Sequence, residues 1–367
     1  MMDSPVARAV AYFEGPPVST EKSVPFRFVG TSSEYFRIWI VNLLLTVLTL
    51  GVYSAWAKVR RKQYFYRNTF VGDTSFEYLA DPIPILKGRL IIAAVLGLVA
   101  VSQYVSLGLY AAMIVFMILA TPWVLVKALS FNARNSAYRN VRFAFRGTTG
   151  ESYKTYFVAL AAYVFTLGLG FPYMQWKMSQ FVVNGHRYGN ASLQFRSKVG
   201  SYFKAFLIAG GATLVLVFVL GIGAAVLFAM TGAGPEASGG AEQQPPGPAF
   251  FIVIFSFYAF LIIPAAYLKA KIANLFLGGI DIGRHRLEST QTFKEVLALL
   301  VTNLLGVAFS LGLAIPWAVT RSYRYRVNHL TVHASGPLVV DAANQHDDPQ
   351  AFGDAATDLG DFDFDFG

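Results

Sequence analysis

The sequence predicts a polytopic α-helical membrane protein with about three internal repeats and short β-hairpins that form a cytoplasmic sheet or barrel. Of its 367 residues, 55% are hydrophobic and only 14% are charged, whereas soluble domains carry about 25% charged residues. The apolar residues lie in runs long enough to cross a bilayer, and the runs 207–230 and 250–268 contain no charged side chain. Short segments with the alternating pattern of β-strands separate these runs.

The same order of segments recurs along the chain. PFRFVGTSSEYFR followed by LTLGVYSAWAKVR returns after 117 residues as RFAFRGTTGESYK followed by FTLGLGFPYMQWK, and a fainter copy runs from Glu295 to Tyr325. Gap-free matches of this kind indicate a repeat architecture. The predicted organisation is a disordered segment 1–24, repeat one at 25–140, repeat two at 141–283 with a Gly/Pro-rich outer loop at 231–248, a partial repeat three at 284–336, and an acidic disordered tail at 337–367.

Each element follows from a local pattern. Alternation from Phe26 to Gly30 predicts a strand, and Gly72-Asp73, Arg139-Asn140 and Gly189-Asn190 predict hairpin turns. A weaker strand pair is expected at 280–288, and a last strand follows residue 328. The apolar segments occur as single, double, single, double and single. They lie at 36–57, then 90–105 with 107–127, then 155–176, then 203–230 with 249–270, and finally 293–318.

The distribution of Lys and Arg predicts which side of the membrane the loops face. The stretch 58–89 has seven Lys and Arg and 127–154 has six, whereas the connections at 101–106 and 231–248 have none. Because Lys and Arg are enriched in cytoplasmic loops, a consistent topology results if only the paired segments cross. Both chain ends and all strand pairs are then cytoplasmic.

This topology requires the three single segments to enter and leave the membrane on one face. Each contains a Thr/Ser-Leu-Gly break, and broken helices are tolerated where protein or water covers the backbone. The alternative is three ordinary spans with tolerated kinks, which their length of about 20 residues allows. The residues of the break motif are Gly51, Gly168, Gly312, Pro172 and Pro316.

The stretch FRFVGTSSEYFRIWIVNLLLTVLTLGVYSAWAKVRRKQYFYRNTFVGDTSFEYLADPIPILKGR resembles the YjgN family, with LTLGVYSAWAKVR as its most specific part. The resemblance covers about residues 25–335. It implies a multi-pass protein of the bacterial inner membrane whose function is unknown, and it implies no catalytic or binding residues.

Polar side chains inside apolar segments are candidate functional residues because an unpaired amide in lipid is costly. They are Asn42, Asn303 and Gln103. Asn42 and Asn303 occupy equivalent repeat positions, where we interpret them as helix contacts, with a polar pathway as the alternative.

Three carboxylates, Glu34, Glu151 and Glu295, precede the single segments. We interpret them as favourable charges in the first helical turn, and the alternative is a ring that binds a cation or carries protons.

Aromatic residues occur where apolar sequence meets basic sequence, and interfacial anchoring explains them better than an aromatic gate. They are Trp56, Trp123, Tyr173 and Trp317. The neighbouring basic stretches supply candidates for anionic lipid headgroups, although simple orientation signals explain them equally well. These candidates are Lys58, Arg60, Arg61, Arg321 and Arg324.

The expected partners are membrane lipids and, through the tail, a cytoplasmic protein, because residues 341–367 hold eight Asp and no Lys or Arg. A plain solvated tail is the alternative. We expect no nucleic-acid partner, because no basic-groove motif or helix-turn-helix pattern appears, and no metal, because too few ligands converge. We expect no cofactor or enzymatic activity, because no phosphate-binding loop or catalytic set is apparent. The leading functional hypothesis is a channel or transporter for a small solute, ion or lipid. The alternative is a non-transporting scaffold or regulator. The sequence does not indicate an oligomeric state.

Overall fold

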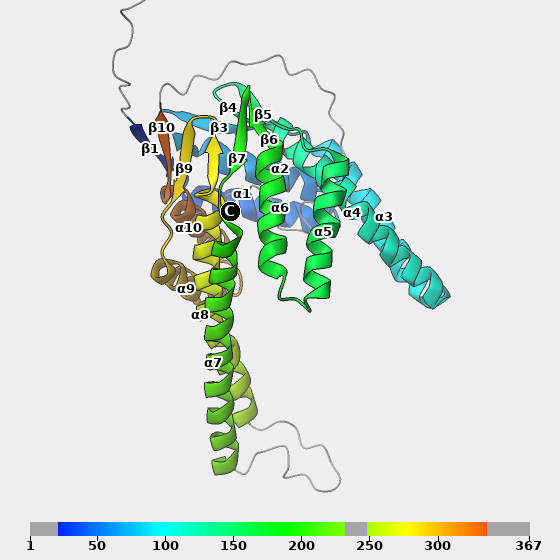
Figure 1. Ribbon diagram of the computed structural model, residues 1–367, viewed down its shortest axis with the longest axis vertical. Coiled ribbons are helices and arrows are strands. Elements are labelled where there is room, and N and C mark those ends of the chain that lie inside the picture. The colour runs from blue at the N-terminus through cyan, green and yellow to red at the C-terminus, as the bar shows by residue number, and fades with distance from the viewer. Residues whose placement is uncertain (1–20, 232–247, 336–367) are drawn as a thin grey trace, which may run out of the picture.

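The computed structural model describes residues 21–231 and 248–335, so the outer loop and the acidic tail discussed above lie outside the described residues. Within them, ten short antiparallel strands close into a barrel, and ten helices lie below it (Figure 1). The strands are β1 Glu21–Phe28, β2 Thr69–Val71, β3 Thr74–Tyr78, β4 Ser136–Tyr138, β5 Val141–Phe145, β6 His186–Tyr188, β7 Ala191–Phe195, β8 Ile280–Ile282, β9 His285–Ser289 and β10 Leu330–Ser335.

The helices are inserted in pairs between successive strands of the barrel. They are α1 Ser32–Leu48, α2 Ser54–Arg67, α3 Pro82–Val105, α4 Leu107–Asn135, α5 Thr149–Phe165, α6 Phe171–Gly185, α7 Val199–Thr231, α8 Pro248–Leu277, α9 Phe293–Phe309 and α10 Ile315–Asn328. Each pair starts after one strand and ends before the next, so all five helical hairpins leave the barrel at the same end. The four tight turns lie at the opposite end.

Both the strands and the helices form closed rings. Strand β1 pairs with β2 through Phe26 opposite Val71, and with β10 through Glu21 opposite Ser335. Each helix packs against the next along the chain, and α10 packs against α1. The first and last elements of the described chain are therefore neighbours.

The tight turns form where the sequence predicts them. Gly72, Gly189 and Gly283 have φ between +56° and +60°, and Arg139 and Asn140 have φ of 51° and 62°. Positive φ matches the twist of two-residue hairpin loops. The main hydrophobic core joins buried strand residues such as Phe28 to buried helix residues such as Phe65 of α2 and Tyr323 of α10.

The structure corrects the predicted boundaries in two places. Strand β1 begins at Glu21, so residues 21–24 are not part of a disordered segment; their hydrogen-bonding partner is β10, far away in the sequence. The basic stretches 58–67 and 321–326 continue α2 and α10 as helix. Pro172 and Pro316 of the break motif lie in the first turn of α6 and α10, where a helix needs no N–H group from proline.

Candidate functional site

The three single apolar segments each form two helices joined by a five-residue turn. Residues Leu50, Leu167 and Leu311 have φ between +49° and +52°, and the glycines that follow them have φ between +91° and +93°. The N–H groups of Gly51, Gly168 and Gly312 donate to the carbonyls of Thr46, Tyr163 and Val307 at 2.8 to 2.9 Å. This is the Schellman arrangement that ends helices, here with leucine in the left-handed position.

A hydroxyl side chain at the end of the first helix starts the second one. Thr49 Oγ1 accepts from the N–H of Tyr53 at 2.9 Å, Thr166 Oγ1 from Gly170 at 2.6 Å, and Ser310 Oγ from Ala314 at 2.8 Å. These bonds satisfy backbone donors that a helix start leaves free. The leucines at the tips are 94 to 95% exposed.

Asn42 and Asn303 link the two helices of their hairpins. Asn42 Nδ2 donates to the Ala57 carbonyl at 3.5 Å, and Asn303 Nδ2 donates to Ala318 O at 3.3 Å and to Ser322 Oγ at 2.9 Å. The two asparagines differ in the hydrogen bonding of their amide oxygen, Oδ1. Asn303 Oδ1 accepts from Arg321 Nη1 at 3.2 Å, whereas the buried Oδ1 of Asn42 has no hydrogen-bond partner.

Gln103 does not join this arrangement. Its side chain is exposed near the end of α3.

The three candidate carboxylates cap the helices that they begin. Glu34 and Thr31 form a capping box at α1, and Glu151 and Thr148 form one at α5. At α9, Thr292 Oγ1 donates to Glu295 Oε2 at 2.6 Å. Two of the carboxylates also accept from a tyrosine of the following helix.

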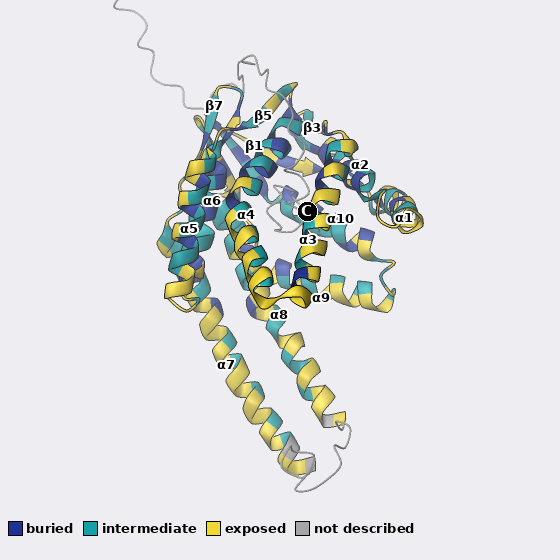
Figure 2. Ribbon diagram, turned by 90° about the vertical axis from the view of Figure 1, so that its right-hand side faces the viewer, coloured by how far each residue is buried: buried dark blue, intermediate teal, exposed yellow. Residues whose placement is uncertain are grey.

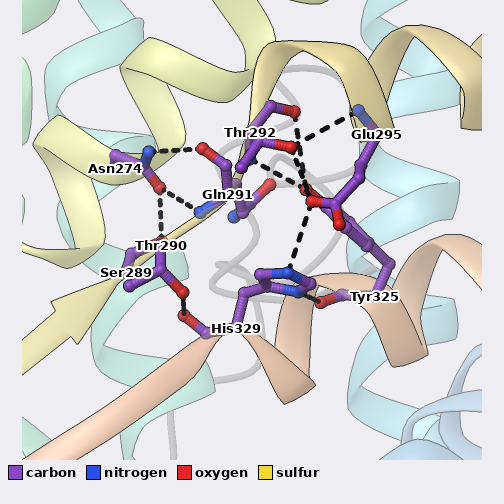
Figure 3. Close-up of polar contacts among 8 residues, drawn as sticks. All are labelled: Asn274, Ser289, Thr290, Gln291, Thr292, Glu295, Tyr325 and His329. Carbon is purple, nitrogen blue, oxygen red and sulfur yellow. Dashed lines mark hydrogen bonds and ion pairs between the residues drawn. The ribbon is translucent and has the colours of Figure 1, made fainter.

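The surroundings of Glu295 are the most extensive of the three (Figure 3). Its Oε2 accepts from Tyr325 Oη at 2.9 Å and lies 3.5 Å from His329 Nε2. Hydrogen bonds from Thr292 and Tyr325 lower the pKa of the Glu295 carboxyl, and burial raises the pKa of Tyr325. Asn274 links α8 to the segment between β9 and α9. Its Oδ1 accepts from Ser289 Oγ at 2.8 Å and from the Gln291 N–H at 2.9 Å.

The interfacial aromatics lie on the second helix of each hairpin and on α4. Trp56 stacks on Tyr53 with ring centroids 6.1 Å apart, and Tyr173 lies 5.9 Å from Trp176. Trp317 lies 5.2 Å below the Arg321 guanidinium. Trp123 is 38% exposed on α4, directly after Pro122.

Two of the five cationic candidates meet at one cavity. Lys58 and Arg61 line a space of about 430 Å³ between α1, α2, α3 and α10, together with Arg89 of α3. Arg60 points elsewhere, with its guanidinium 6.0 Å from the Tyr53 ring, and Arg324 Nη2 donates to the Gly30 carbonyl at 2.7 Å. Arg321 of α10 donates to Asn303 Oδ1 of α9.

Sequence reasoning did not select Arg89, Ser54, Tyr35 or Trp39 for this cavity. Arg89 resembles one more cytoplasmic positive charge, although its place about two turns into a long apolar helix also indicates a functional residue. Among the described residues, no group of three or more His, Asp or Glu is placed to hold a metal ion.

In the part of the chain that the structure describes, four helices are long and apolar enough to cross a membrane: α3, α4, and segments of α7 and α8. Only 11 to 17% of the residues in their most apolar windows are buried. Figure 2 shows exposed residues along α7 and α8 beyond the barrel. Such continuous exposed apolar surface is expected of helices in contact with lipid.

Comparisons with known proteins agree with this picture. Residues 23–359 match the profile of a family described as "Bacterial protein of unknown function (DUF898)". A protein of Salmonella typhimurium named inner membrane protein YjgN is 32% identical over 125 residues, which is 32% of this chain and 30% of that protein. A protein of the same name from Escherichia coli K12 is 45% identical over 64 residues, which is 17% of this chain and 16% of the relative.

These matches span less than a third of the length of either curated relative. No solved structure matches the chain. The family match covers most of the sequence, and the four apolar helices agree with the names of the relatives. The chain is therefore an integral membrane protein that belongs to the bacterial DUF898 family, which includes the inner membrane proteins named YjgN.

Proposed function

We propose that this protein resides in the bacterial inner membrane, carries its barrel on the cytoplasmic side, and moves a lipid or similar amphiphile through the helical region. The observation that carries the proposal is the set of three broken helical hairpins, α1–α2, α5–α6 and α9–α10. Both ends of each hairpin join the barrel, and an exposed leucine occupies each tip.

The helix lengths support re-entry of these hairpins rather than complete crossing. Their helices have 14 to 17 residues, so the longest rise about 25 Å, less than the hydrocarbon core of about 30 Å. Helices α3, α4, α7 and α8 have 24 to 33 residues. If these four cross, the barrel and the bases of the three short hairpins lie on one face.

The distribution of charge supports a cytoplasmic barrel. The turns at the tips of the short hairpins, 49–53, 166–170 and 310–314, contain no Lys or Arg. The basic residues of α2 begin at Lys58, about one turn after the tip, and continue to Arg67 at the barrel end. Cytoplasmic segments carry the excess of Lys and Arg.

The tips support a role that involves lipid. A non-glycine residue in the left-handed region costs about 1 kcal/mol or more, and the chain accepts this cost at Leu50, Leu167 and Leu311. Glycine would remove the strain but also the side chain. An apolar side chain at the tip stabilises a hairpin that ends within the hydrocarbon. We propose that the three hairpins are related copies that shape a path for the amphiphile, and we assign the protein no enzymatic step.

Cysteine labelling tests the topology, since the native chain has no Cys. Asn190→Cys probes a barrel turn, Ser106→Cys the α3–α4 connection and Leu167→Cys a hairpin tip. We expect an impermeant thiol reagent added to intact spheroplasts to label only Ser106→Cys, and Asn190→Cys to react in inverted vesicles. Labelling of Leu167→Cys from outside as fast as Ser106→Cys would refute re-entry.

Lipid exchange in proteoliposomes tests the activity. A fluorescent phospholipid in both leaflets is bleached from outside, and we expect the protected half to become accessible faster with protein than without it. Replacing Leu50, Leu167 and Leu311 together by Ser should slow the exchange. Leu214→Ser, on the exposed face of α7, is the matched control. Exchange equal to that of empty liposomes would overturn transport and favour the scaffold alternative.

A further inference from the structure

The cavity at the first hairpin combines an apolar wall with a strongly basic one. Trp39 and Leu43 of α1 and Ile315 and Val319 of α10 line the apolar side. Lys58, Arg61 and Arg89 line the other side, and the described lining residues include no Asp or Glu. The volume of about 430 Å³ falls within the range typical of small-ligand sites.

The basic groups are held by the helices rather than by a flexible loop. Lys58 is only 9% exposed, and Arg89 Nη1 donates to Ser54 Oγ, which ties α3 to the start of α2. Lys and Arg bind phosphate and carboxylate groups through convergent charged hydrogen bonds, and three cations around one site suit the phosphate of a lipid headgroup. An apolar wall beside it suits an anion that carries a hydrocarbon chain.

A second, independent observation also indicates a ligand here. Asn42 is 7% exposed and lines the cavity, and its Oδ1 is buried without a hydrogen-bond donor. In the third hairpin the corresponding atom of Asn303 receives its donor from Arg321. Arg60 takes the position of Arg321 in the first hairpin, but it lies against Tyr53. A buried acceptor without a donor is costly, so a ligand that brings an O–H or N–H group would complete the site.

We propose that this cavity binds the headgroup of an anionic phospholipid, with Lys58, Arg61 and Arg89 on the phosphate and Asn42 accepting from a headgroup hydroxyl. The acyl chains would leave along the apolar wall toward the membrane. An anionic phospholipid is then the substrate class of the proposed function. Its movement across the membrane rests on that proposed function, whereas its binding at the cavity does not.

Binding to the purified protein in phosphatidylcholine nanodiscs tests the site, with labelled phosphatidylglycerol as the probe. Arg61→Gln removes one exposed charge of the cavity and should weaken binding about 10- to 100-fold, since a charged hydrogen bond contributes roughly 1.5–3 kcal/mol. Arg60→Gln, one residue away and outside the cavity, should change binding less than about twofold. Equal losses in both variants would show surface attraction only and overturn the site.

Two further ligands test the headgroup hydroxyl and the acyl chains separately. Phosphatidylmethanol has the same phosphodiester without headgroup hydroxyls and should bind about 2- to 10-fold more weakly. Asn42→Leu should abolish that preference while leaving phosphatidylmethanol binding unchanged. An undiminished preference in Asn42→Leu would overturn the role of Asn42. Soluble glycerol phosphate should compete only weakly, and competition equal to that of the lipid would overturn the lipid assignment.

The binding and exchange assays fail independently. Specific phosphatidylglycerol binding without lipid exchange would leave the site standing and reject transport. Lipid exchange that is equally fast in wild type and in Arg61→Gln, without specific binding, would reject the site and leave transport standing.

Discussion

Replacing the two hairpin asparagines by leucine should have unequal effects on stability, although each lies at the same position in the first helix of its hairpin. Asn303 makes three hydrogen bonds, to Ala318, Ser322 and Arg321, at 2.9 to 3.3 Å. Asn42 makes one, of 3.5 Å. Interhelical hydrogen bonds in membrane proteins contribute about 0.6 kcal/mol on average. Asn303→Leu should therefore lower the free energy of unfolding by about 2 kcal/mol.

Asn42→Leu should lower it by less than about 0.5 kcal/mol, because a bond at the limit of length contributes little. The substitution also removes a buried acceptor without a donor, which offsets the loss. Leucine is larger than asparagine, so neither change leaves a cavity, and at position 42 the adjoining space between the helices gives the larger side chain room. Ala159, 1% exposed at the corresponding position of the second hairpin, shows that a hairpin of this kind packs without the amide.

The measurement is equilibrium unfolding of lipid-free protein in mixed micelles with increasing SDS, followed by tryptophan fluorescence. Lipid must be absent because a ligand bound at Asn42 would itself stabilise the folded state. A destabilisation by Asn42→Leu equal to that by Asn303→Leu would refute the assignment of an unsatisfied Oδ1 in the first hairpin.

Three further predictions concern the backbone and the barrel. Gly168→Ala, at φ +93°, should cost about 1–2 kcal/mol in the same assay, whereas Gly97→Ala inside α3, with open space around it, should be neutral or stabilising. Gly30→Ala should cost about 1–3 kcal/mol because its Cβ would lie 2.6 Å from the Phe28 ring and 2.8 Å from Tyr64 Oη; an unchanged midpoint would contradict this. Burial lowers the pKa of His186 to about 4 from 6.5. Below pH 6.5 the His186 imidazole is protonated in the unfolded state but stays neutral in the folded state. The free energy of unfolding therefore falls by about 2 kcal/mol between pH 7 and pH 5. A non-titrating His186→Asn variant should lose that part of the pH dependence.

The hairpins and the helix breaks could be predicted from local sequence. Gly72-Asp73 and Gly189-Asn190 specify tight turns by themselves, and Thr49-Leu50-Gly51 carries both the helix end and the hydroxyl that starts the next helix. The helical continuation of Lys58 to Arg67 does not follow from an apolar stripe, because the buried face of α2 includes Lys58 and Lys62.

The cavity could not be predicted because its walls come from distant parts of the chain. Arg89 meets Ser54 only once α3 packs against α2, and Ile315 reaches α1 only because the ring of helices closes. The sequence places Asn42 and Asn303 in equivalent positions, yet it cannot show that Arg321 turns toward its amide while Arg60 turns toward Tyr53. Such differences depend on side-chain packing rather than on pattern.

The pairing of β1 with β10 places a condition on biogenesis. During translation the first strand emerges long before its partner, so its outer edge has no neighbour until α10 has been made and Leu330–Ser335 has left the ribosome. Open strand edges invite pairing with other chains. Without β10, both β1 and β9 keep an unpaired edge, so the barrel can close only after the last strand has been made. The order of synthesis therefore makes closure of the barrel one of the last steps of folding.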